Sequence, residues 1–197
     1  MAYLSLDELK RYLGITDDDA GSSGTGDDGP SSPDDTLLTE LLEAAHAQID
    51  RYTGRTFEAA TDTVRTYAVD EDASGRILYL DADLCQITNI VTGGEALDTD
   101  DYTAIPRNGT PYYAITLRAG SGARWADDIE VTGLWAWSAV PPADIIQATR
   151  RLAAYLYRQK DAQVFDVTAQ VATGAVTVRH QMPGDVRDLL DPYVRRV

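Results

Sequence analysis

Apolar residues recur at steps of three and four near both ends of the chain, and at steps of two in its middle. The first spacing is typical of a helix with one buried face, and the second is typical of a strand. Near the N-terminus, Ser5 and Glu8 fit a capping box, and Gly14 is placed to end a helix. One stripe of leucines lies between them, so the sequence predicts a short helix here.

A second helix is predicted to begin at Pro33, after Ser32 as its N-cap, and to end at Gly54. Its apolar residues repeat at steps of four and three, which predicts a seam that faces a partner helix. The seam consists of Leu38, Leu42, Ala45, Ile49 and Tyr52, and it is widened by Leu37 and Leu41.

A third helix is predicted from about Ala143 to Lys160, directly after the two prolines that end the strand region. Its main stripe consists of Ile145, Thr149, Leu152 and Leu156. Further apolar residues spread over much of its circumference, which predicts burial on two sides. One side can meet the second helix, and the other can meet a neighbouring subunit.

Between these helices, from Val64 to about Trp137, the alternation predicts strands. Two pairs of turn residues, Gly93-Gly94 and Asn108-Gly109, predict hairpins. We expect one strand to carry Ile129, Val131, Trp135 and Trp137 on a single face. The region is therefore interpreted as a small antiparallel sheet inserted between helices.

The predicted fold class is α+β: a small helical bundle core with an inserted antiparallel β-sheet and a C-terminal hairpin plus short helix. The helical core is expected to comprise residues 1–63 and 138–163, and the β portion residues 64–137. Residues 164–197 supply the hairpin, the short helix opened by Pro183, and a tail. Within the core, residues 16–35 are rich in Asp, Gly and Ser, which predicts a flexible surface loop.

The net charge is −15, with 25 Asp, 7 Glu and only two Lys. Such a surface repels a nucleic-acid backbone, so the composition argues against a DNA-binding regulator. Two interpretations stay open. The composition is typical of proteins from a very salty, halophilic cytoplasm, and it would also suit a passage through which DNA slides without sticking.

No apolar run approaches the roughly 18 residues that span a bilayer, and the first residues do not resemble a signal peptide. We therefore expect a soluble protein in the cytoplasm where it is made. The single cysteine, Cys85, lies in an apolar stretch and is expected to be a small buried hydrophobe.

Candidate catalytic chemistry is sparse. His46 lies at the boundary of an apolar seam, and His180 has no carboxylate near it in sequence; neither fits a metal-ligand pattern. The acidic pairs are interpreted as solvated turns, and the Gly-rich segments lack the lysine of a phosphate loop. We therefore expect no catalytic residue, no metal site and no cofactor, which argues against an enzyme.

Three segments carry a resemblance to a known family. The first combines residues 3–14 with residues 48–57, the second runs from residue 129 through 135 into 141–145, and the third spans 182–193. Together they resemble the head-tail connector (adaptor) proteins of tailed bacteriophages and related archaeal tailed viruses. No single segment is diagnostic, but their order and spacing cover nearly the whole chain. Two departures are the long acidic loop and the large inserted sheet.

The resemblance implies a virion protein of the viral neck, made in the host cytoplasm and assembled as a ring oligomer beneath the portal. The ring is usually a dodecamer, of about twelve copies. It continues the DNA channel and docks the next neck protein, a stopper or a tail-proximal protein. In such proteins the C-terminal segment commonly reaches the portal. Here the portal-binding residues would be Leu190, Pro192, Tyr193, Val194, Arg195 and Arg196, with motif support only as far as Tyr193.

Contacts between subunits would fall mainly on the second and third helices. The candidate inter-subunit residues are Leu37, Leu41, Ile146, Ala153 and Tyr157. Twelve copies of a chain with a charge of −15 carry about −180 formal charge, so we hypothesise that acidic side chains line the channel. The alternatives are another neck ring, such as a stopper or tail terminator, and a halophilic binding module or small enzyme unrelated to virions.

Overall fold

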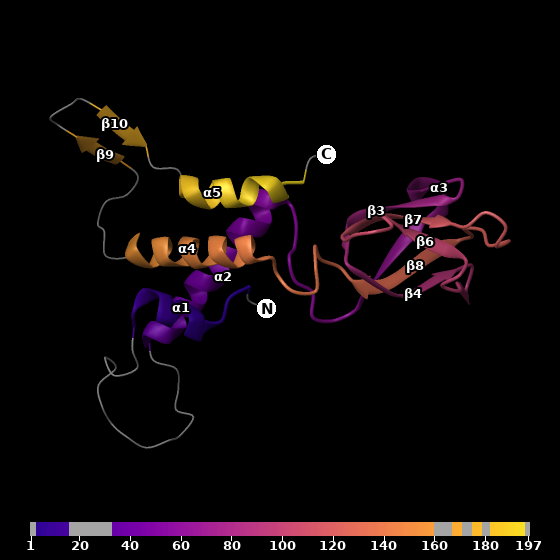
Figure 1. Cartoon of the computed structure of the whole chain (residues 1–197), viewed down its shortest axis with the longest axis horizontal. Helices are drawn as coiled ribbons and strands as arrows, with labels where there is room; N and C mark the ends of the chain where they lie inside the picture. The colour runs from indigo at the N-terminus through magenta and orange to yellow at the C-terminus, as the bar shows by residue number, and fades with distance from the viewer. Residues whose placement is uncertain (1–2, 16–32, 160–166, 171–174, 179–181, 196–197) are drawn as a thin grey trace, which may run out of the picture. The chain divides into compact units, whose positions relative to one another are not determined.

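The computed structural model describes residues 3–15, 33–159, 167–170, 175–178 and 182–195. The chain divides into two compact units: residues 55–142 form a β unit, and residues 2–54 together with 143–197 form a helical unit (Figure 1). The predicted α+β class is confirmed. The predicted loop as far as Ser32, together with His180 and Arg196, lies outside the described residues.

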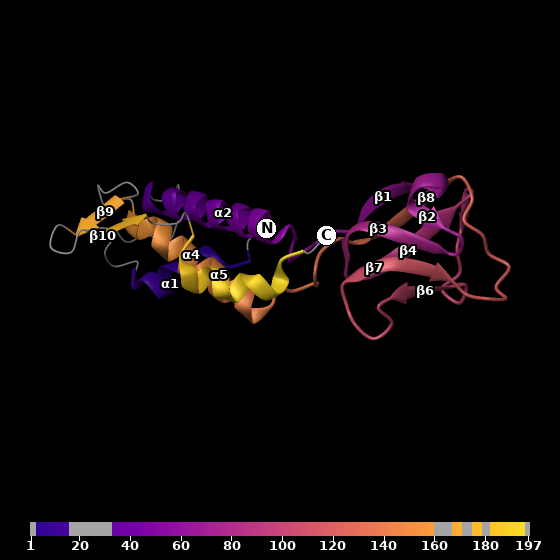
Figure 2. The ribbon, with the colours of Figure 1, turned by 90° about the horizontal axis from the view of Figure 1, so that it is seen from above.

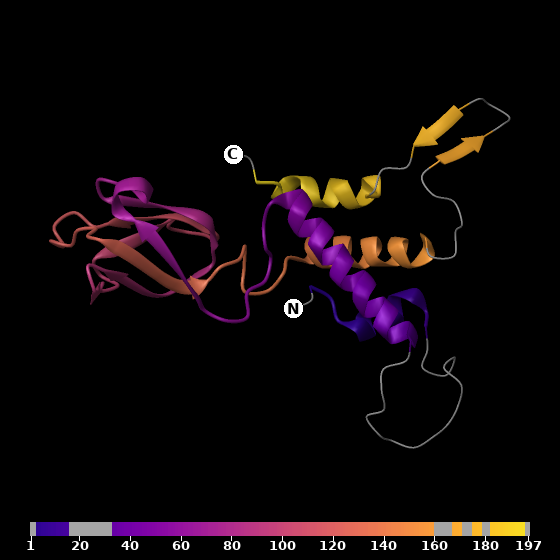
Figure 3. The same cartoon turned by 180° about the vertical axis from the view of Figure 1, so that it is seen from behind.

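In the helical unit, α4 (Ala143–Gln159) is the middle helix of a layer of three. Helices α1 (Leu6–Leu13) and α5 (Gly184–Leu190) lie on either side of α4, and α2 (Pro33–Thr53) crosses one face of this layer and contacts all three helices (Figures 2 and 3). A short 3₁₀ turn, η2 (Asp191–Tyr193), follows α5. Helix α4 is thus covered on two sides within a single chain.

The ends of α1 follow the sequence signals. The backbone N–H of Glu8 donates to Ser5 Oγ at 3.3 Å, and the backbone N–H of Ser5 donates to Glu8 Oε2 at 3.0 Å. Gly14 adopts the left-handed conformation with φ of +74°, which a residue without Cβ adopts at no steric cost. The predicted capping box and helix end are confirmed.

The predicted seam of α2 forms the core of the helical unit. Leu38, Ala45 and Ile49 are fully buried, and Ile145 and Leu152 of α4 are fully buried as well. Burying one such aliphatic side chain contributes roughly 1.5–3 kcal/mol, so this layer holds the unit together. The buried seam is shorter than predicted, because Tyr52 at its C-terminal end is only half-buried.

The β unit contains two four-stranded antiparallel sheets, ordered β1-β8-β4-β5 and β2-β3-β7-β6. The strands are β1 (Thr63–Ala68), β2 (Ala73–Ser74), β3 (Ile77–Leu84), β4 (Gln86–Thr92), β5 (Glu95–Ala96), β6 (Tyr102–Ile105), β7 (Tyr112–Leu117) and β8 (Asp128–Leu134). A short helix, α3 (Val69–Asp72), joins β1 to β2. Buried side chains from both sheets, among them Leu78, Ile115, Ile129 and Val131, form one core. The predicted strand region thus folds as two sheets.

Both predicted turns join paired strands. Gly93 and Gly94 have φ of +60° and +80° between β4 and β5, as a tight two-residue hairpin requires. Asn108-Gly109 lies between β6 and β7, which pair from Tyr102 with Leu117 onward.

Strand β8 ends earlier than predicted. It stops at Leu134. Trp135 still packs in the same core as Ile129 and Val131, as predicted, whereas Trp137 is not part of that core. The Nε1–H of Trp135 donates to the carbonyl of Thr63 at 3.0 Å. Just before this end, the backbones of β8 and β4 approach closely at Gly133. A Cβ at this position would lie 2.1 Å from the Gln86 carbonyl oxygen, so the close approach requires glycine.

Residues Val167–Gln170 (β9) and Ala175–Val178 (β10) pair as an antiparallel hairpin, as predicted. The predicted final helix is α5. Among the described residues, no helix combines the length and apolar character that crossing a membrane requires.

Candidate functional site

The C-terminal segment after α5 is fastened to the ends of two other helices. The backbone N–H of Arg195 donates to the Thr53 carbonyl at 2.8 Å, and the Tyr193 hydroxyl donates to Asp144 Oδ2 at 3.2 Å. Burial and the Asp144 carboxylate raise the pKa of Tyr193, so its hydroxyl keeps the donated proton. The segment therefore presents one defined surface.

The residues predicted to bind the portal differ in exposure. Pro192 is exposed, while Tyr193, Val194 and Arg195 are half-buried. Leu190 is fully buried in the helical unit, so its side chain serves the core of its own chain in this conformation. The surface offered to a partner by this segment therefore begins after Leu190.

The residues predicted to lie between subunits divide in the same way. Leu37 and Leu41 on α2, and Ile146 and Tyr157 on α4, are half-buried and keep some surface for a partner. Ala153 is fully buried, because it faces the interior of the helical unit. Its side chain offers no area to another subunit.

Two clusters in the β unit each combine an arginine, an aspartate and a tryptophan. Arg55 lies 2.6 Å from Asp83 and its guanidinium stacks 4.7 Å from the Trp137 ring centroid. Arg65 likewise lies 2.6 Å from Asp81 and 4.7 Å from the centroid of Trp135.

A cavity of about 340 Å³ beside the second cluster is lined by Arg65, Thr66, Tyr67, Asp72 and Asp81. The Tyr67 hydroxyl donates to Asp81 Oδ1 at 2.6 Å, and burial with this hydrogen bond raises the Tyr67 pKa. The charged groups are thus occupied with one another, and the clusters act as structural ties. Sequence reasoning missed them; the signal was Asp81-Ala82-Asp83, where carboxylates alternate inside an apolar strand.

His46 is buried rather than at a boundary, with 9% of its surface exposed. Its Nε2 accepts the backbone N–H of Tyr3 at 3.0 Å, and the Tyr3 hydroxyl donates to Asp50 Oδ1 at 2.5 Å. Burial lowers the pKa of His46 to about 4, so the ring is neutral near pH 7. The neutral His46 ring accepts the backbone N–H of Tyr3, and this hydrogen bond holds the N-terminal segment against α2.

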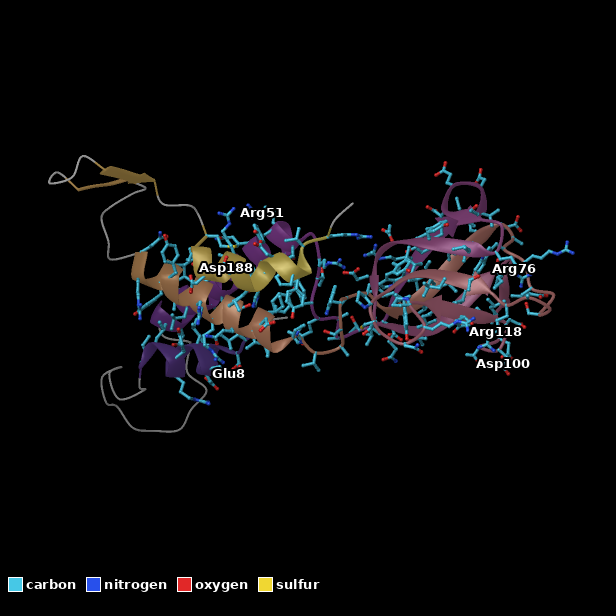
Figure 4. The ribbon with its side chains drawn as sticks, turned by 45° about the horizontal axis from the view of Figure 1, so that its top comes forward. Glu8, Arg51, Arg76, Asp100, Arg118 and Asp188 are labelled. Atoms are coloured by element: carbon cyan, nitrogen blue, oxygen red, sulfur yellow. The ribbon has the colours of Figure 1, made fainter. Side chains whose placement is uncertain are left out.

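Other reactive groups have similar structural surroundings. Cys85 is half-buried, its Sγ lies 3.4 Å from the Leu134 carbonyl oxygen, and burial raises its thiol pKa. Arg118 and Asp100 approach to 3.8 Å at an exposed edge of the β unit (Figure 4). Within the described ranges, no group of three or more His, Cys, Asp or Glu side chains is arranged to hold a metal ion.

Comparisons with known proteins reveal a shared fold. No family model and no curated protein matches the chain. A chain in the neck of an empty gene transfer agent (GTA) particle, computed with C6 symmetry, has a TM-score of 0.58 and 20% identity. That match covers 99% of this chain and 91% of the other.

A chain in the virion of a native GTA particle has the same TM-score and the same coverage of both chains, with 19% identity. A chain in the neck of a native GTA particle, computed with C12 symmetry, has a TM-score of 0.53 and 19% identity over 82% of this chain and 84% of that one. The chain therefore has a fold that also occurs in the necks of gene transfer agent particles.

Proposed function

We propose that this chain is a head-tail adaptor, a non-enzymatic structural subunit of a tailed-virus neck. The observation that carries the proposal is the fold likeness to a GTA neck chain, which extends over 99% of the present chain. The three sequence segments that resemble head-tail connector proteins support the same interpretation. One of them, residues 182–193, coincides with α5 and η2.

The adaptor forms a ring of about twelve copies beneath the portal. The C6 and C12 symmetries of the similar neck structures support an oligomer of this kind. The half-buried residues of α2 and α4, Leu37, Leu41, Ile146 and Tyr157, supply apolar area for contacts between copies. Covering such area is the main driving force of stable association.

The portal contact falls on Pro192, Tyr193, Val194, Arg195 and Arg196, and the lower surface of the ring docks a stopper or tail-proximal protein. DNA passes through the ring without specific binding. A charge of −15 per copy disfavours adhesion of phosphate backbones if acidic side chains line the passage. A structure of the assembled ring with a neutral or basic lumen would contradict this part of the proposal.

Mass photometry of the purified chain, with and without the portal protein of the same virus, tests the proposal in low and high salt. A ring of about twelve subunits, or a monomer that assembles only on the portal, is expected. A ring that ignores the portal and binds a tail protein would indicate a stopper or tail terminator. A persistent monomer in every condition would refute the ring and favour a binding module.

A further inference from the structure

An open groove runs over α4 between α1 and α5, with a volume of about 320 Å³. Its lining includes Tyr12 of α1, with Arg151, Ala154, Tyr155 and Arg158 of α4. Tyr12 is 47% exposed, so the groove has an aromatic wall in contact with solvent. The groove is therefore lined by side chains suited to a partner with polar and apolar atoms.

The lining of this groove carries two arginines, Arg151 and Arg158, against one carboxylate, Asp185, so its net charge is positive while that of the chain is negative. Residues 143–197 carry eight Lys and Arg against six Asp and Glu, whereas residues 1–142 carry nine against 26. Arg151 is held by Asp185 of α5 at 2.8 Å, and Arg150 stacks 5.7 Å from the ring centroid of Tyr12. Arg158 is exposed at the end of the groove. The groove thus favours an acidic partner.

An acidic surface lies on helix α2 of the same unit. Helix α2 exposes Glu40 and Glu43 in one stripe with Thr36, Ala44 and Ala47, spaced as one helical face requires. The two alanines carry nothing beyond Cβ, so another element can approach this stripe closely. Helix α2 crosses one face of the layer formed by α1, α4 and α5 (Figures 2 and 3). The lining of the groove contains residues of α1, α4 and the α5 segment and none of α2, so the stripe and the groove lie on different faces of the unit.

We propose that the acidic stripe of α2 in one copy occupies the arginine groove of the next copy. This inference rests on the proposed ring and adds which two faces meet. Two surfaces on different faces of a subunit associate head to tail, and such contacts close into a ring when each copy is rotated relative to the last, by about 30° for twelve copies. Glu40 and Glu43 pair with Arg151 and Arg158, and half-buried Leu37 and Leu41 beside the stripe cover Tyr12 and Tyr155.

Charge reversal in full-length chains tests the pairing. One variant carries Arg158→Glu, and the second carries Glu40→Arg and Glu43→Arg. Arg158 is preferred to Arg151, because Arg151 also holds Asp185 within its own chain. Each variant alone is expected to weaken ring formation at least tenfold, because every interface in its ring brings like charges together.

Mixing the two variants in equal amounts is the decisive measurement. Each interface of an alternating ring pairs opposite charges, so native mass spectrometry should find rings with equal numbers of both variants. Recovery on mixing also demonstrates that each variant is folded. Arg107→Glu and Glu95→Arg, both at exposed positions of the β unit, are the matched controls and should assemble as wild type does.

The outcomes separate this inference from the ring itself. If wild type assembles and both variants assemble equally well, the face assignment is wrong and the ring stands. If each variant loses ring formation and mixing the two variants does not restore it, the proposed pairing is also overturned. Rings of Arg158→Glu that form normally but no longer bind the portal would assign the groove to the portal instead. A wild-type chain that is always monomeric overturns both proposals.

Discussion

The buried imidazole of His46 makes the helical unit sensitive to acid. Its Nε2 accepts a backbone hydrogen bond from Tyr3, and an Nε2 that carries a proton cannot accept one. Burial places the folded-state pKa at about 4, against 6.5 for an exposed histidine. Between these two values the unfolded chain binds the proton more readily, so the free energy of unfolding falls as the pH falls.

The magnitude follows from the two pKa values. The contribution of His46 to the free energy of unfolding is fully present above pH 6.5. It decreases by about 2 kcal/mol on going to pH 5, and by about 3 kcal/mol if the pH is taken below 4. Asp50 acts in the opposite direction, because burial raises its pKa and the folded state gains from protonation. A comparison between two variants that both keep Asp50 removes most of that contribution.

We therefore compare wild type with His46→Gln, whose side-chain oxygen can accept the same N–H without titrating. Urea unfolding is measured from pH 7.5 to pH 5, above the sequence pI of about 4.3, where solubility is lowest. Circular dichroism at 222 nm follows the helical unit. All three tryptophans, Trp125, Trp135 and Trp137, lie in the β unit, so their fluorescence follows that unit separately.

The stability of wild type relative to His46→Gln should decline by about 2 kcal/mol across this range in the dichroism transition. The fluorescence transition should show no such difference, which provides an internal control. A difference that stays constant with pH would refute the assignment of His46 as a neutral buried acceptor. A difference confined to fluorescence would place the effect in the wrong unit.

Three further outcomes are expected. Gly133→Ala should destabilise the β unit by about 3 kcal/mol or more in fluorescence-detected unfolding, because the new Cβ would meet the Gln86 carbonyl at 2.1 Å; an unchanged midpoint would contradict this close approach. Asp83→Asn should cost about 2 kcal/mol by removing the charged partner of Arg55, whereas Asp100→Asn, at a 94% exposed carboxylate, should stay within about 0.5 kcal/mol. Truncation after Asp191 should abolish portal binding in a pull-down while the ring mass persists, and undiminished binding would remove the portal contact from this segment.

The sequence predicts what local patterns encode. The capping box at Ser5, the helix end at Gly14 and the seam from Leu38 to Ile49 follow from spacing alone, and the structure has each of them. The tight hairpin at Gly93-Gly94 is similarly local, because only residues without Cβ accept positive φ at both positions so readily.

Features that depend on distant partners could not be predicted. Asp81 and Asp83 look like solvent-facing breaks in a strand until the fold brings Arg65 and Arg55 to them. The groove over α4 likewise forms only when α1, from the N-terminal part of the chain, and α5, from its C-terminal part, both pack against α4. The division of one predicted sheet into two also depends on pairing, since β2 and β5 contain two residues each and have no detectable periodicity.

The helical unit is assembled from two stretches of chain separated by the whole β unit. During synthesis α2 leaves the ribosome long before α4, and at 5–20 residues per second the delay is on the order of ten seconds. Over that interval Leu38, Leu42 and Ile49 have no α4 to cover them, while residues 55–142 are synthesised and all the strands of the β unit are completed before α4. We expect the β unit to fold first during translation, and the nascent helical unit to depend on chaperones until the C-terminal stretch emerges.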